Sequence, residues 1–149
     1  MSGSALKSLH VLFACLFLGN VIVSGIWAAM AERTRNHQII QFSNRLVLIT
    51  DVLFTATGAV GVFITGHAMA GRYETAPGWI SWSYALFGLS GLIWALVLLP
   101  IQLKQRRLLR LHDHITAEYL KLSRLWQISG LVATALPLPV LYLMVAKVG

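Results

Sequence analysis

Apolar residues run almost without interruption through four long stretches of the chain. The stretches run approximately over residues 5–30, 46–70, 80–103 and 125–146. About 20 residues rising 1.5 Å each cross the ~30 Å hydrocarbon core of a bilayer, so each stretch can span it as an α-helix. The pattern therefore predicts an all-α integral membrane protein, in which residues 1–149 form a single domain of four transmembrane helices arranged as an up-down bundle.

A different period appears between the third and fourth stretches. Over residues 105–122, apolar side chains recur at spacings of three and four. This period is typical of an amphipathic helix. We expect the segment to lie on the membrane surface or to extend the third span.

Small residues and prolines within the spans predict how the helices pack. Gly58, Gly61 and Thr65 lie on one stripe of the second span, as is typical of close helix packing. We expect similar packing from Gly88 and Gly91 of the third span. Pro137 and Pro139 each remove an intrahelical hydrogen bond, which predicts a kink in the fourth span.

Composition and charge agree with a membrane protein and predict its orientation. The chain is 57% hydrophobic and only 11% charged, too few charges for the surface of a soluble domain. Nine of the 12 lysines and arginines fall in or beside the first and third connections, at positions 33, 35, 45, 104, 106, 107, 110, 121 and 124. Because basic loops stay in the cytoplasm, we expect both termini outside. Basic residues beside apolar spans indicate lipid, not nucleic acid, as the partner.

Two histidines are candidate cofactor ligands, because ionisable groups within a bilayer are costly. His10 lies in the outer half of the first span, where a neutral imidazole is either an axial haem ligand or hydrogen-bonded near the headgroups. His67 lies at similar depth in the second span. It falls ~160° around an ideal helix from Asp51, however, so it points away from the expected interior.

Asp51 and Asn20 are the other polar candidates within the spans. Asp51 is either a proton site or cation ligand, or a structural group paired with one of Arg45, Arg124, Gln127 and Asn20. No metal site is expected, since Cys15 is the one cysteine and His112 and His114 do not share a helix face.

Several segments are similar to a known family. They are Leu6-Lys7-x-Leu9-His10-Val11, Phe17-Leu18-Gly19-Asn20, Ala31-Glu32-Arg33-Thr34-Arg35, Thr50-Asp51-x-x-Phe54-Thr55, Ala85-Leu86-Phe87-x-Leu89-Ser90-Gly91 and Leu98-Leu99-Pro100. Together they resemble bacterial predicted integral membrane proteins of unknown function (domain of unknown function 2269). This resemblance implies a multi-pass protein of the bacterial cytoplasmic (inner) membrane.

The opening Lys7-x-x-His10 more distantly resembles HemJ-type protoporphyrinogen oxidases and copper-resistance D membrane proteins. In the HemJ type a first-span histidine ligates haem b, and that match implies His10. The chain departs from the HemJ type where residues 26–30 lack its second histidine, and where Trp126-Gln127-Ile128-Ser129 replaces Asn-Glu-x-Pro. The resemblance thus extends to haem ligation but not to the oxidase chemistry.

The resulting hypothesis is a four-helix membrane protein that binds haem b through His10, with His67 as second ligand. It would serve either electron transfer or the handling of haem and porphyrins. If it is an enzyme, we expect a haem-dependent oxidoreductase. One alternative is a copper or proton transport protein that uses Asp51, Asn20 and Cys15. Another is a non-catalytic scaffold or assembly partner, acting as a homo-oligomer or with another membrane protein.

Overall fold

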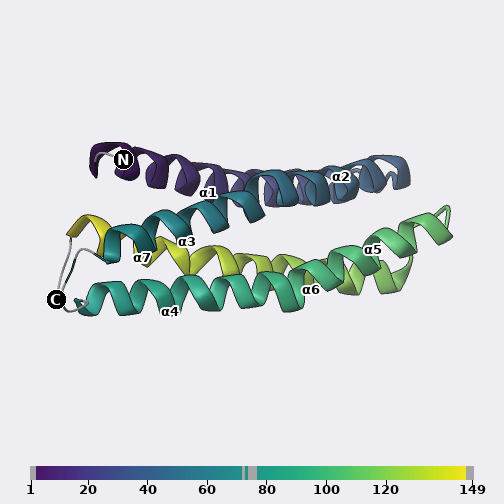
Figure 1. Cartoon of the computed structure of the whole chain (residues 1–149). Helices are drawn as coiled ribbons and strands as arrows, with labels where there is room; N and C mark the ends of the chain where they lie inside the picture. The colour runs from purple at the N-terminus through teal and green to yellow at the C-terminus, as the bar shows by residue number, and fades with distance from the viewer. Residues whose placement is uncertain (1–2, 72, 74–76, 147–149) are drawn as a thin grey trace.

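The computed structural model describes residues 3–71, 73 and 77–146. All regular structure within these ranges is helical, and four long helical segments run side by side (Figure 1). Each is long and apolar enough to cross a membrane: Gly3–Arg33, His37–Ala70, Gly78–Leu111 and Ala117–Ala146. Successive segments alternate in direction, which confirms the predicted membrane bundle.

The first span is one helix, and the second is divided by a π-helical turn. Helix α1 (Gly3–Arg33) is followed by α2 (His37–Thr50), the π-turn η1 (Asp51–Ala56) and α3 (Thr57–Ala70). A π-turn adds a residue to the turn and shifts the face that the following helix presents. The second span therefore presents differently oriented faces before and after η1.

The third span also contains a π-turn, and the fourth is broken near its prolines. Helix α4 (Gly78–Ile93) leads through η2 (Trp94–Leu98) into α5 (Leu99–Leu111). The fourth span consists of α6 (Ala117–Ala135) and α7 (Pro137–Ala146). The break falls directly before the first of the two prolines, where a helix kink was predicted.

Residues 105–122 do not form the single amphipathic helix that the periodicity predicts, because they are divided between the end of α5 and the start of α6. Helix α5 extends the third span as far as Leu111, and His112 then adopts an extended conformation (φ −124°, ψ 145°). The Thr116 hydroxyl accepts a hydrogen bond from the Tyr119 backbone N–H, 3.1 Å away, and so starts α6 as a new helix. The apolar residues from Tyr119 onward therefore belong to the fourth span.

The two turns at residues 34–36 and 112–116 lie at the same end of the bundle, here called the basic end (Figure 1). The four segments contact one another around this end, through α1 with α2 and α6, and α2 with α5. Toward the opposite end, α1 packs along α3 and α4 packs along α7. Of the three lysines and arginines that the charge pattern leaves for the opposite end, Lys7, Arg72 and Lys147, the last two lie outside the described residues.

Glycines of the second span allow α1 and α3 to approach closely, as predicted. A Cβ built on Gly58 would lie 2.9 Å from the Phe17 backbone nitrogen, and one built on Gly61 would overlap the Phe13 ring. The glycines of the third span differ, because a Cβ on Gly88 or Gly91 would meet no atom within 4 Å. Among the described glycines, close packing of this kind is therefore found between α1 and α3.

Replacing Gly58 by alanine should separate α1 from α3, since the obstacle is rigid backbone and not a flexible side chain. We expect a lower midpoint for thermal unfolding in detergent. Gly88→Ala is the matched control and should be neutral or stabilising, because alanine has the higher helix propensity. Equal effects of the two substitutions would contradict this account of the packing.

Candidate functional site

The first residue of η1, Asp51, is the most deeply placed carboxylate in the described part of the chain. It is only 5% exposed and follows 14 residues of α2, roughly 21 Å along the helix from its start at the basic end. The second π-turn, η2, lies on the adjacent third span. Because π-turns occur frequently at functional sites, their presence on both spans directs attention to this level of the bundle.

Three side chains, from α1, from η1 itself and from α5, donate hydrogen bonds to the Asp51 carboxylate. Oδ1 accepts from Asn20 Nδ2 and from Thr55 Oγ1, each at 3.1 Å. Oδ2 accepts from Gln102 Nε2 at 2.8 Å. All of these partners are neutral. Of the four partners that the sequence suggested for Asp51, Asn20 is the one that bonds to it in the described residues.

Cations do not take part in this site. Within the described residues, the ion pairs join Lys104 to Glu118 and His114 to Asp113, both at exposed positions. Neither Arg45 nor Arg124 forms an ion pair with Asp51, although both were considered as partners. The carboxylate is thus stabilised by hydrogen-bond dipoles rather than by an opposite charge.

Gln102 is the residue that sequence reasoning missed. It is 1% exposed, and while Nε2 is bonded to Asp51, its Oε1 has no hydrogen-bond partner. Its position close to Lys104 made it look like part of an interfacial helix end. A buried face could have been inferred from the one-turn polar spacing of Gln102 and Gln105, since both are buried in the structure.

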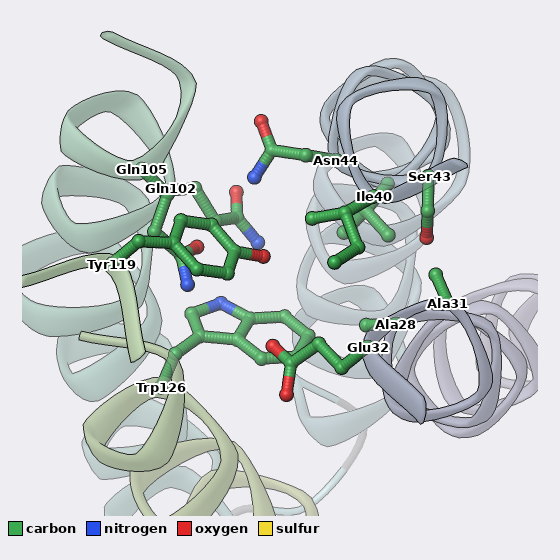
Figure 2. A pocket seen from close by; sticks show the side chains of 11 residues that line it. Ala28, Ala31, Glu32, Ile40, Ser43, Asn44, Gln102, Gln105, Tyr119 and Trp126 are labelled. Carbon is green, nitrogen blue, oxygen red and sulfur yellow. The ribbon is translucent and has the colours of Figure 1, made fainter. Parts of the chain in front are cut away.

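A small polar pocket of about 20 Å³ adjoins Gln102 (Figure 2). Such a volume holds about one water molecule. The walls come from all four spans: Ala28, Ala31, Glu32, Ile40, Ser43, Asn44, Val47, Gln102, Gln105, Tyr119 and Trp126. Several wall atoms are buried without a hydrogen-bond partner: Ser43 Oγ, Asn44 Oδ1, Gln102 Oε1 and Trp126 Nε1. A water or another small polar guest would satisfy these atoms.

A second carboxylate, that of Glu32, forms part of the wall of this pocket. Glu32, in the last turn of α1, accepts hydrogen bonds from Ser123 Oγ and, at 2.8 Å, from Gln127 Nε2 of α6. Like Asp51, it has only neutral hydrogen-bond donors among the described contacts. The pocket therefore lies between two carboxyl groups without cationic partners, and Gln102 separates it from Asp51.

His10 is buried where α1 meets α3. Its Nδ1 lies 2.8 Å from Thr65 Oγ1, and that hydroxyl donates its proton to the Gly61 carbonyl at 2.6 Å. With the hydroxyl donating to Gly61, the tautomer that completes this arrangement carries its proton on Nδ1 and its lone pair on Nε2. A neutral histidine fixed through Nδ1 has the form that metal-ligating histidines adopt.

His67 lies apart from His10. Its imidazole is exposed on α3, with Nδ1 3.0 Å from the Tyr84 hydroxyl of α4. Thr65, the partner of His10, is two residues from His67 and hence ~200° away around the helix. One haem held by both histidines does not fit this arrangement. The described residues also contain no group of three or more His, Cys, Asp or Glu side chains that could hold a metal ion.

Comparison with known proteins places the chain in a family without providing an activity. A family model described as "Predicted integral membrane protein (DUF2269)" matches residues 4–148. No curated protein and no solved structure matches the chain.

Substituting Gln102 by methionine should destabilise the bundle, because Asp51 Oδ2 would lose its donor in a buried site. We expect a loss of about 1–3 kcal/mol in the free energy of unfolding, measured by reversible unfolding in mixed micelles. Gln41→Met is the control, since Gln41 is exposed and its amide donates to a backbone carbonyl, that of Leu109, 3.3 Å away, and to no carboxylate among the described contacts. In the Asp51→Asn background the effect of Gln102→Met should shrink. Strict additivity would argue against the Asp51–Gln102 interaction.

Proposed function

Since the chain belongs to the DUF2269 family of predicted integral membrane proteins, we propose that it is a proton-handling transport protein of the membrane, with Asp51 as the group that binds and releases the proton. The observation that carries this proposal is a buried carboxylate with only neutral donors, joined through Gln102 to a polar pocket that reaches Glu32. Proton transport was one of the alternatives left open by the sequence.

The surroundings of Asp51 favour reversible protonation. A purely structural carboxylate within a bilayer is usually paired with a cation, which keeps it ionised. Asp51 instead accepts hydrogen bonds from two amides and a hydroxyl. Such donors stabilise the ionised form without cancelling its charge, so the neutral acid remains within reach when a proton arrives.

Gln102 is suited to serve both protonation states. An ionised Asp51 takes a hydrogen bond from Nε2, as in the structure. A protonated Asp51 needs an acceptor instead, and rotating the Gln102 amide by half a turn would present Oε1, which has no partner now. Gln102 could then form a hydrogen bond with either protonation state of Asp51 by turning its amide, without any movement of the helix.

The proton route leads from Asp51 toward the basic end. A water in the polar pocket would lie between Gln102 and Glu32, whose carboxylate is half-buried at the end of α1. The proton would pass from the aqueous side to Glu32, then to the pocket water and to Asp51 when Gln102 turns aside. The charge distribution predicts that this end faces the cytoplasm.

Aromatic packing closes the opposite side of Asp51. Phe13 and Phe17 of α1 pack against Gly61 and Gly58, and the Phe17 ring meets Phe87 edge-on at 5.6 Å. This apolar layer separates the Asp51 site from the His10–Thr65 pair. In the proposed mechanism this layer would close the site on that side and leave access from the basic end, as alternating access requires.

The proposal predicts that proteoliposomes containing the protein take up protons when a potential is imposed, reported by an internal pH-sensitive dye. Asp51→Asn should abolish this uptake, because an amide binds no proton at neutral pH. Glu32→Gln should slow the uptake while leaving Asp51 intact. Asp113→Asn is the control: it removes an exposed carboxylate at the same end and should leave the rate unchanged.

Uptake by the Asp51→Asn variant at the wild-type rate would overturn the proposal. Wild-type vesicles no more permeable than empty vesicles would also overturn it, unless uptake appears with a co-substrate and still depends on Asp51. Copper added to the assay discriminates the metal alternative, since copper-dependent flux insensitive to Asp51→Asn would support that alternative instead.

Haem binding at His10 alone is a second candidate, favoured by the free lone pair on Nε2 that the Thr65 bond implies. Haem b would be held by this imidazole and would supply redox chemistry at the α1–α3 interface. His67 would not share that role, because it faces Tyr84 on the other side of α3.

An absorbance spectrum of protein purified from haem-sufficient cells tests this second candidate. We expect a Soret band that sharpens with dithionite and disappears in His10→Ala, with His67→Ala as the unaffected control. A colourless wild-type protein would remove haem from consideration and leave the Asp51 proposal untouched.

A further inference from the structure

A second, larger cavity opens between α2 and α5 at the basic end. Its volume is about 450 Å³. The walls are Gln38, Gln41, Phe42, Asn44, Arg45, Arg106, Leu109 and Arg110. We call it the arginine cavity, and we propose that it binds the phosphate group of an anionic phospholipid.

The three arginines of this cavity have no anionic partner. The described acids are engaged elsewhere: Asp113 with His114, Glu118 with Lys104, and Asp51 and Glu32 with neutral donors. Three guanidinium groups around one cavity repel one another unless an anion lies between them. Arg106 is half-buried, so its charge is only partly screened by solvent.

Phosphate is the anion that these side chains suit best. The planar guanidinium donates paired hydrogen bonds to two phosphate oxygens, and several arginines together can surround the group. Asn44 and the glutamines add neutral hydrogen-bonding groups to the walls. Nothing in the lining carries a negative charge that would oppose an anion.

The position of the cavity favours a lipid as the source of the phosphate. Arg106 lies one helical turn beyond Gln102, toward the end where headgroups are expected. Phe42, one of the wall residues, is 67% exposed, so its ring is available to contact an acyl chain. Basic pockets between transmembrane helices on the cytoplasmic side commonly bind anionic headgroups.

Native mass spectrometry of the full chain, titrated with phosphatidylglycerol or with phosphatidylcholine of the same acyl chains, tests the proposal. We expect a preference for phosphatidylglycerol that falls about tenfold in Arg45→Gln/Arg106→Gln, as loss of charge-assisted hydrogen bonds predicts. The control Arg107→Gln/Arg124→Gln removes the same charge from exposed arginines outside the cavity and should keep the preference. Arg45→Lys/Arg106→Lys, which retains the charge, should bind with intermediate affinity.

An equal loss in the control would overturn the proposal, because it would indicate general charge attraction. Absence of any preference in the wild type would overturn it as well. Inorganic phosphate is titrated in a separate arm. If it binds as tightly as phosphatidylglycerol, and with the same dependence on Arg45 and Arg106, the site takes free phosphate and the lipid assignment is wrong. None of these measurements reports proton movement, so the lipid proposal can fail while the Asp51 proposal stands, and the reverse.

Discussion

A carboxylate among membrane-spanning helices must receive its hydrogen bonds from the protein, because the hydrocarbon around it offers none. Asp51 receives them from Asn20 of the first span and Gln102 of the third, as well as from Thr55 of its own. Apolar contacts cannot set helix rotation in this way, since lipid tails pack against leucine as well as other helices do. The mutual orientation of three spans therefore depends on this one group.

The π-turns make that arrangement compatible with close packing elsewhere. An extra residue in η1 turns α3 relative to α2, so the same span presents Asp51 to the polar interior and then Gly58 and Gly61 to α1. The turn lies between the polar groups around Gln102 and the phenylalanine layer that packs on Gly58 and Gly61.

The sequence predicts depth along a span far better than direction around it. The four spans follow from apolar length, and Asp51 and Asn20 follow from their cost in a bilayer. Glu32 and Gln102 were missed because each lies near cations in the sequence and so resembles an interfacial residue. Gly88 and Gly91 looked like packing residues but face open space, since small size does not indicate which side of a helix is covered. The π-turns leave no mark in hydrophobic periodicity.

Asn44 lines both the polar pocket and the arginine cavity, so the two proposed sites share a wall. Charge in one of these sites would therefore bear on charge in the other through the protein between them. If both proposals hold, arginines without an anion in the cavity would favour the ionised forms of Glu32 and Asp51. A lipid phosphate that neutralises the arginines removes this effect and so favours the protonated acids. The two sites are therefore linked in sign: an anionic lipid in the arginine cavity would promote proton uptake at Asp51, and deprotonation of Asp51 would oppose lipid binding by the same free energy.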